Sequence, residues 1–265
     1  MRTAVVTIAR GRHDHLAAQA RALTQDPPDL HVVVAMDDRD LAAVVPGAEV
    51  VDVPLDRGAL PLAAARNAGV RRARELRADL LVLLDVDCIP SPNLLGRYRE
   101  AAATHGGVLC GPVGYLPPPP AGGYPPTGLA ELAVAHPARP VPGDDEVLAA
   151  PEPDLFWSLS FATTPDVWDE VGGFCEDYRG YGGEDTDFGH AAARAGVAMF
   201  WVGGAWAWHQ HHGAGGTPVQ HLDDILRNAT VFHDRWGWWP MLGWLDDLRQ
   251  RGLAHVDARG RWVRS

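Results

Sequence analysis

The chain has 265 residues, of which 46% are apolar, so it can bury the core of one large domain or two small ones. Its net charge of −11, with arginine as the only strong cation, argues against nucleic acid or an anionic membrane as the main partner, because either would need a clustered basic face. Cys88, Cys110 and Cys175 are widely spaced and include no CxxC pair, which excludes a disulfide framework and a cysteine zinc site.

Short apolar or β-branched runs alternate with helical patterns through the first half of the chain. This alternation predicts a doubly wound, mostly parallel α/β sheet of Rossmann-like type. We expect strands at 3–8, 30–36, 50–53, 80–84 and 108–113, and helices at 15–23, 61–77 and 92–104. Such sheets bind ligands beyond the carboxyl ends of their strands, where Asp37, Asp85 and Asp87 lie.

Residues 116–153 include a run of four prolines and many more. They predict a long surface excursion without regular structure, apart from a short helix at 127–135, and loops of this length are often lids or binding loops.

The second half continues the alternation less regularly. We expect strands at 158–163 and 198–202, helices at 165–171 and 219–236, and a terminal hairpin around 258–260. No apolar run approaches the roughly 20 residues that span a bilayer, and the amino terminus lacks the apolar region of a signal peptide, so a reducing cytoplasm is the expected location.

A glycine-rich acidic loop, GYGGEDTD at 180–187, precedes another expected helix. Its glycines allow positive φ or close approach to a ligand, and the acids Glu184, Asp185 and Asp187 follow at once. An apolar stripe would hold the acidic first turn in place, and Gly196 would end the helix; the stripe comprises Phe188, Ala191, Ala192 and Ala195. Taken alone, acids that merely complement the helix macrodipole, worth roughly 0.3–1 kcal/mol each, explain the loop about equally well.

Asp85 and Asp87 form an Asp-Val-Asp directly after the apolar strand at 80–84. In extended conformation both carboxylates would share one face of the strand. Two such ligands suit Mg²⁺ or Mn²⁺ held together with phosphates, so Asp85 and Asp87 are expected metal ligands. Asp-X-Asp alone is more often surface acid, but its place at a strand end favours the metal site.

These residues resemble those of the GT-A nucleotide-sugar glycosyltransferases of the family 2 type, whose metal-binding Asp-X-Asp occupies the same topological place. The loop GYGGEDTD resembles the tryptophan-glycine-glycine-Glu-Asp loop of the β-1,4-galactosyltransferases and of related polypeptide N-acetylgalactosaminyltransferases. The resemblance covers most of the chain and implies one GT-A domain over 1–265. Its nucleotide-sugar-binding half would be 1–115 and its acceptor and catalytic half 154–265.

The resemblance also implies roles for single residues. Asp185 would be the base that deprotonates the acceptor hydroxyl, and Glu184 would bind the acceptor sugar beside Gly183, with Tyr181 where the family usually has Trp. The residues implied to contact the nucleotide are Ala9, Arg10, Asp37 at the uracil ring, Arg66, Asn67 and Asp85. A capping or salt-bridging role explains Arg66 nearly as well.

In this family a histidine downstream of the base often completes the metal shell, and His209, His211 and His212 follow the strand at 198–202. With alternating geometry His209 and His211 share a face, so one of them is expected to reach the metal at Asp87 while the other is structural. His209 is narrowly favoured.

Trp157 and the tryptophan-rich tail each have two interpretations. Trp157 could line the sugar site, because aromatic faces stack on sugar rings, although core packing explains it equally well. The tail, with Trp236, Trp238, Trp239 and Trp244, would suit a lipid-linked acceptor at the inner face of a membrane, but without a basic amphipathic face core packing is favoured.

The implied activity is metal-dependent transfer of a sugar, of galactose or N-acetylhexosamine type, from a UDP-sugar to a saccharide, glycolipid or small hydroxyl acceptor. One base without a second nucleophilic carboxylate predicts a single displacement with inversion. A nucleotidyltransferase acting on a sugar phosphate is the alternative enzyme, but ARGRHDH after the first strand is a poor phosphate loop. A silent sugar- or nucleotide-binding module of the same fold is the third interpretation, against which the intact acidic motifs argue.

Overall fold

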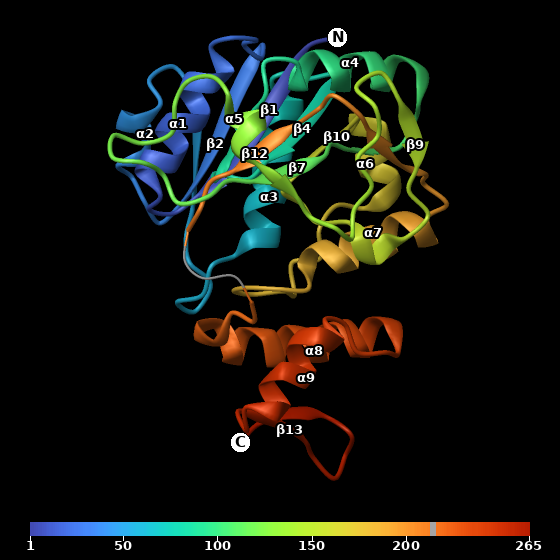
Figure 1. The fold of residues 1–265 in the computed structure, drawn as a ribbon. Helices are drawn as coiled ribbons and strands as arrows, with labels where there is room; N and C mark the ends of the chain where they lie inside the picture. The colour runs from blue at the N-terminus through green and yellow to red at the C-terminus, as the bar shows by residue number, and fades with distance from the viewer. Residues whose placement is uncertain (213–215) are drawn as a thin grey trace.

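An eight-stranded sheet forms the centre of this computed structural model, which describes residues 1–212 and 216–265 (Figure 1). The strand order is β3-β2-β1-β4-β10-β6-β11-β9, and β9 and β10 run antiparallel to their neighbours while the other strands run in one direction. The strands are β1 (Thr3–Ala9), β2 (Leu30–Met36), β3 (Glu49–Val53), β4 (Leu80–Leu84), β6 (Val108–Cys110), β9 (Val147–Ala149), β10 (Ser160–Thr163) and β11 (Met199–Val202). The expected mostly parallel α/β sheet is confirmed.

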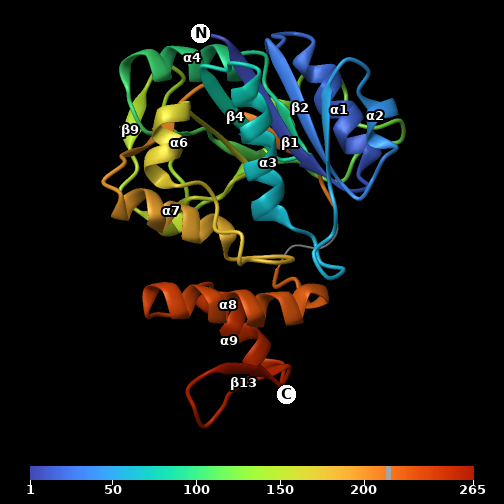
Figure 2. The same ribbon diagram turned by 180° about the vertical axis from the view of Figure 1, so that it is seen from behind.

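Helices cover both faces of this sheet. On one face α1 (His13–Leu23) and α4 (Leu94–Thr104) pack against it, with α2 (Leu41–Val44) beside α1. On the other lie α3 (Leu62–Glu75), α6 (Pro165–Val171) and α7 (Glu184–Arg194), which face the viewer in Figure 2. Gly69 lets α3 approach closely, since a Cβ there would lie 2.4 Å from a methyl group of Val6.

A second, four-stranded sheet has the order β5-β12-β7-β8. Its strands are β5 (Cys88–Pro90), β12 (Ala207–His209), β7 (Val113–Tyr115) and β8 (Val134–Ala135). The single strand expected at 108–113 is therefore wrong, because β6 and β7 belong to different sheets. The chain changes sheets at Gly111, where a Cβ would lie 2.1 Å from the carbonyl oxygen of Ala205.

The proline-rich excursion contains more regular structure than the sequence predicts. The helix expected at 127–135 is the short α5 (Leu129–Leu132), followed directly by β8, which pairs with β7. Farther along, β9 joins the edge of the large sheet beside β11. Strands of two or three residues are too short to show an alternating pattern, so composition alone missed them.

The carboxyl-terminal residues form a unit with its own hydrophobic cluster, which lies below the sheet in Figure 1. The helix expected from 219 begins as a 3₁₀ turn, η2 (Val219–His221), and continues as α8 (Leu222–Trp236), with the expected stripe buried. Then come α9 (Leu242–Gln250) and the expected hairpin, β13 (Ala254–Val256) and β14 (Trp262–Arg264). A 3₁₀ turn, η1 (Pro153–Leu155), precedes β10. Among the helices described, none is long and apolar enough to cross a membrane.

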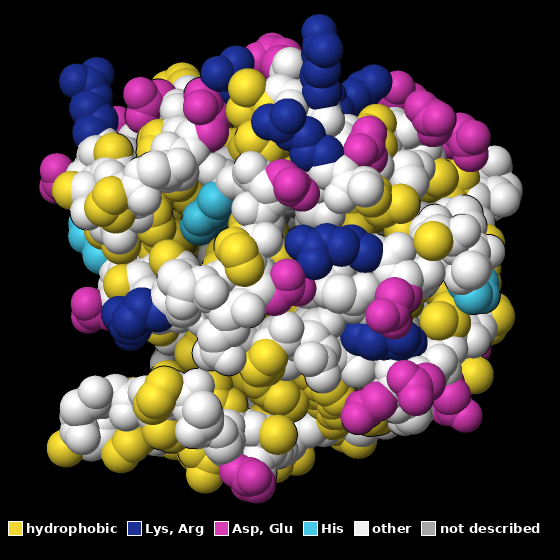
Figure 3. Space-filling view, turned by 90° about the horizontal axis from the view of Figure 1, so that it is seen from above, with side chains coloured by type: hydrophobic (Ala, Val, Ile, Leu, Met, Phe, Trp, Pro, Cys, Tyr) yellow, Lys and Arg dark blue, Asp and Glu magenta, His cyan; other side chains and the backbone are white. Residues whose placement is uncertain are grey.

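The two ends of the parallel strands differ in character. Figure 3 shows the face at their amino ends, on which arginine and acidic side chains are interspersed. Their carboxyl ends point the other way, toward α7 and α8 (Figures 1 and 2). The residues that the sequence singles out lie at the carboxyl ends.

Candidate active site

The carboxyl ends of β1 and β4 lie side by side at the centre of the large sheet. From β1 the chain crosses through α1 to β2 on one side, whereas β4 lies on the other, so the strand order reverses here, as it does where such sheets bind ligands. Buried Gln19 of α1 fixes the loop after β4, because its side-chain amide donates to the carbonyl oxygens of Asp85 (2.7 Å) and Cys88 (3.0 Å).

The Asp-Val-Asp segment in this loop is a turn. The N–H of Cys88 donates to the carbonyl oxygen of Asp85 (2.9 Å), so the expected extended conformation is wrong. A turn sends the two carboxylates to different partners. Asp85 contacts Arg66, and Asp87 contacts two histidines.

Asp87, His209 and His212 form a cluster that could hold a metal ion, with one ligand atom from each within 4.8 Å of the other two. His212 Nε2 lies 2.9 Å and His209 Nε2 3.6 Å from the Asp87 carboxylate. Pairing of β12 with β5 sets His209 opposite Cys88, the neighbour of Asp87 in the chain. One carboxylate and two imidazoles suit a divalent transition metal better than Mg²⁺, which prefers oxygen ligands.

Electrostatics favour the ligating forms of these side chains. Burial alone would raise the pKa of Asp87, but the hydrogen bond from His212 and the neighbouring positive charges outweigh it and lower that pKa. Burial lowers the pKa of His209, more than the charge of Asp87 raises it. A carboxylate and a neutral imidazole are the forms that bind metal.

His211 lies outside this cluster. It is exposed, and its backbone N–H donates to the hydroxyl of Tyr124 in the excursion (2.8 Å). Because β12 ends at His209, strand alternation does not reach His211, and the chain returns to place His212 beside Asp87. The sequence-based prediction chose His211 over His212 because it extended strand alternation beyond the end of β12.

Substitution of the histidines tests this geometry. We expect His209→Ala and His212→Ala each to lower the affinity for Mn²⁺, measured calorimetrically with UDP present, by about tenfold or more. His211→Ala should bind Mn²⁺ like the parent, because its side chain lies apart. A loss for His211→Ala with no loss for His212→Ala would contradict the geometry.

Arg66 of α3 joins the two acidic motifs. Its side chain is buried, its Nη2 donates to Asp85 (3.1 Å), and its Nη1 donates to Glu184 at the start of α7 (3.0 Å). Its guanidinium also lies 5.2 Å from the ring centroid of Phe174. The two carboxylates outweigh the effect of burial and raise the pKa of Arg66 further. The salt-bridging interpretation thus describes the contacts of Arg66, while its contact with a nucleotide stays a prediction.

Removing this cation should destabilise the fold. Arg66→Met leaves two acids without their cation in a buried site, and we expect the free energy of unfolding to fall by about 3–5 kcal/mol. Arg74→Met on the same helix breaks an exposed pair with Asp169 and should cost no more than about 1 kcal/mol. Urea unfolding of both variants measures the difference, and equal losses would show that the Arg66 bridge does not hold the site together.

The glycine-rich loop is fastened to the carboxyl-terminal unit. Gly180 has a left-handed φ of 65°, which favours glycine, and a Cβ there would lie 2.1 Å from the carboxylate of Asp224 in α8. Asn228 of α8 donates to the carbonyl oxygens of Arg179 (2.9 Å) and Gly182 (2.8 Å). Tyr181 is 40% exposed. Its ring stacks with the rings of His221 (4.8 Å between centroids) and Trp244 (5.9 Å).

Asp185 lies in the first turn of α7, after Gly183, whose φ of 92° begins the helix. Burial and the adjacent charge of Glu184 raise the pKa of Asp185 to about 7, although the N–H of Thr186 (2.7 Å) and the charge of Arg66 oppose the shift. The helix macrodipole alone predicts the opposite direction. A carboxyl group with this pKa is suited to accept a proton near neutral pH.

Asp187, the third acid of the loop, is an internal anchor. It is 1% exposed and accepts hydrogen bonds from Arg235 Nε (2.7 Å), Trp236 Nε1 (2.7 Å) and Tyr178 Oη (3.2 Å). Its hydrogen bonds therefore tie α7 to the end of α8. On the rest of the helix Phe188, Ala191 and Ala192 are buried as expected, whereas Ala195 is exposed at the end.

The expected nucleotide residues are spread along the carboxyl edge of the sheet. Ala9 ends β1 and is buried, and Arg10 lies 4.0 Å from Asp37, whose side chain is mostly exposed after β2. Asn67 instead braces the chain after α6, because its side chain donates to the carbonyl oxygen of Phe174 (2.9 Å) and accepts from that residue's N–H (3.0 Å).

Asp38 follows the expected nucleotide residue Asp37, and the sequence analysis assigned it no role. Its carboxylate accepts from the N–H of Gly11 (2.6 Å) and lies 3.0 Å from His13 Nε2, so it fixes the loop after β1. Its only signal in the sequence is its position next to Asp37 at the end of a strand.

Trp157 is half-buried and belongs to a chain of rings that reaches the metal cluster. Its ring meets His136 edge-on (4.7 Å between centroids), His136 lies near Tyr115 (6.2 Å), and Tyr115 lies near His209 (5.0 Å). The guanidinium of Arg139 stacks between Trp157 (5.3 Å) and Trp201 (4.6 Å), and none of its nitrogens has a hydrogen-bond partner within the described ranges. Its pKa is lowered by burial.

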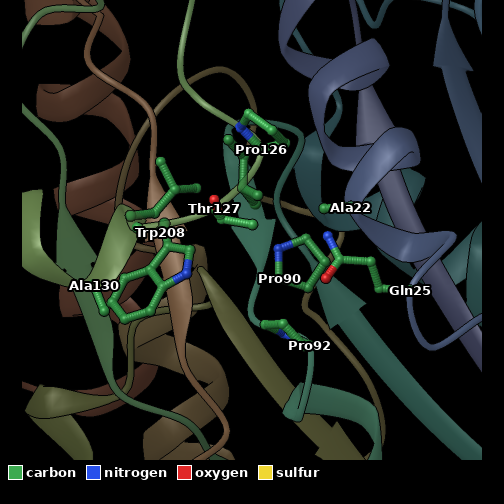
Figure 4. Close-up of a pocket in the computed structure, with 11 residues that line it drawn as sticks. Ala22, Gln25, Pro90, Pro92, Pro126, Thr127, Ala130 and Trp208 are labelled. Carbon is green, nitrogen blue, oxygen red and sulfur yellow. The ribbon is translucent and has the colours of Figure 1, made fainter.

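A separate pocket of about 170 Å³ opens beside α1 and β5. Figure 4 shows Trp208 on one side, Pro90 and Gln25 on the other, and Pro126 and Thr127 above them. None of its lining residues carries a charge, so it cannot supply the acid–base or metal chemistry of the site.

No family model and no curated protein matches this sequence. Among solved structures the chain is similar to one described as GalNAc-T7 with UDP, GalNAc and Mn²⁺, with a TM-score of 0.58 and 15% identity. The match covers 80% of this chain but only 44% of that one. The chain therefore has a GT-A-like fold, and because a fold hosts many activities, its function rests on the residues of the site.

Proposed function

We propose that this chain is a metal-dependent glycosyltransferase that moves a sugar from a UDP-sugar to an acceptor hydroxyl with inversion at the anomeric carbon. A donor of galactose or N-acetylhexosamine type and a saccharide, glycolipid or small hydroxyl acceptor fit the proposal. The UDP, GalNAc and Mn²⁺ named for the structural neighbour support it.

The bridge through Arg66 is the observation that carries this proposal. It connects Asp85, in the same turn as the metal ligand Asp87, to Glu184, which precedes Asp185. A sugar transferase needs a diphosphate site and a base on opposite sides of one sugar ring. Acids from both motifs also act on Tyr181, because its pKa is raised by burial and then by their charges.

Residues at both motifs would have separate roles in the reaction. Asp185 would accept the proton of the attacking hydroxyl, and Glu184, held by Arg66, would orient the acceptor sugar. The rings of Tyr181 and Trp244 would offer it an apolar face. Asp87, His209 and His212 would hold a divalent cation, which would neutralise charge on the leaving diphosphate.

Thermal stabilisation by nucleotides tests the proposal without knowledge of the acceptor. UDP with Mn²⁺ should raise the melting temperature, and UDP or Mn²⁺ alone should raise it less. A nucleotidyltransferase would instead be stabilised by nucleoside triphosphates over UDP. A silent binding module would be stabilised by UDP-sugars but would release no UDP from them. If no uridine nucleotide raises the melting temperature, the proposed function is contradicted.

A further inference from the structure

The loop after β1 places a cation against the metal cluster. Arg12 Nη1 lies 3.7 Å from Asp87 Oδ2, the same oxygen that lies 2.9 Å from His212 Nε2. The backbone of Arg12 is left-handed, with φ of 56°, and α1 begins at the next residue. Its side chain is about one-third exposed, so it can change partners without opening the core.

We propose that Arg12 is the counter-ion of Asp87 in the ligand-free protein and becomes a ligand of the donor diphosphate, so that the site takes up the divalent cation together with the diphosphate. This inference rests on the proposed function and explains how the same site selects its ligand.

The charges around the cluster support this exchange. Asp85, the other acid of the turn, is already paired with buried Arg66, so Asp87 is the one carboxylate of the cluster, and Arg12 balances it. A divalent cation entering alone would meet the positive charge of Arg12 at short range. A diphosphate that enters with the cation reverses the sign of this interaction, because a guanidinium binds phosphate oxygens through charge-assisted hydrogen bonds.

The ligand set leads to the same conclusion independently. One carboxylate and two imidazoles leave a six-coordinate ion such as Mn²⁺ short of oxygen ligands, and phosphates commonly supply them. The amino terminus of α1, which begins beside Arg12, adds a partial positive charge that favours phosphate at the same place.

Calorimetry on Arg12→Met should show two changes in binding affinity of opposite sign, one for Mn²⁺ and one for UDP. Mn²⁺ alone should bind the variant about fivefold more tightly than the parent, because the competing cation is gone. UDP in saturating Mn²⁺ should bind at least about tenfold more weakly, because its phosphates lose a charged partner. Uridine, which lacks phosphates, should bind both proteins equally.

Two variants control this comparison. Arg12→Lys keeps the charge on an unbranched side chain in the same left-handed backbone and should restore most of the UDP affinity. Arg21→Met makes the same substitution at the exposed far end of α1 and should leave all three affinities unchanged. Parallel losses of Mn²⁺ and UDP affinity in Arg12→Met, or unchanged UDP affinity, would overturn the inference. If the parent binds no UDP with Mn²⁺, the proposed function itself fails.

Discussion

Asp185→Asn is expected to lower the rate of sugar transfer by at least about two orders of magnitude, the scale of a general base, and to leave UDP-sugar affinity unchanged. The amide keeps the size of the side chain but cannot accept the acceptor proton. Asp185 is held rigidly for this task, because α7 is fixed by buried Phe188 and by the hydrogen bonds of Asp187. Transfer rates and calorimetric donor affinities of both proteins measure the effect.

The rate of sugar transfer should also depend on pH. Since burial and Glu184 raise the pKa of Asp185 to about 7, the base is protonated below that pH and the rate should fall there, rising to a plateau above it. Glu184→Gln removes a negative charge that raises this pKa, so the midpoint of the acid limb should move to lower pH. Near-parental transfer by Asp185→Asn, with loss in Glu184→Gln or Asp187→Asn, would mean that the base is misassigned.

Asp87→Ala is expected to abolish Mn²⁺-dependent UDP binding while the fold survives. Asp87 is the one carboxylate of the metal cluster, and without it two imidazoles and Arg12 face each other with no anion between them. The backbone contact that pairs this turn with β12 uses the carbonyl oxygen of Asp87, which accepts from the N–H of Gln210 (2.7 Å), so it is unaffected by the side chain.

Calorimetry of UDP with Mn²⁺ and a circular-dichroism melting curve check both halves of this expectation. Asp87→Asn is the matched variant, because it keeps the shape of the side chain and removes only its charge. Unchanged nucleotide affinity in either variant would place the metal elsewhere.

The fold was predictable where segments are long and strongly patterned. The apolar runs of β1, β2 and β4 identified the parallel half of the sheet, and the stripe of α8 identified that helix. The second sheet was not predictable, because β8 and β12 have two or three residues and owe their existence to partners far along the chain. Pairing of that kind leaves no local pattern in the sequence.

The site was predictable as a set of motifs but not as an arrangement. Spacing drew attention to Asp85, Asp87 and Asp185, because carboxylates at strand ends and helix starts stand out. The connection through Arg66 depends on α3 placing one side chain within reach of both Asp85 and Glu184, which no spacing reveals. Likewise, His212 rather than His211 faces Asp87 because the chain bends after β12, and strand alternation cannot describe a bend.

In the proposed function, the cluster around Asp87 and the base Asp185 serve one transfer reaction. Release of UDP from a panel of UDP-sugars, with Mn²⁺ or with a chelator and with parent or Asp185→Asn protein, tests it most directly. We expect at least one UDP-sugar to yield UDP only when Mn²⁺ is present, and an added acceptor to accelerate the parent but not Asp185→Asn. If no UDP-sugar yields UDP, or if release is the same with the chelator, the cluster and Asp185 do not serve such a reaction.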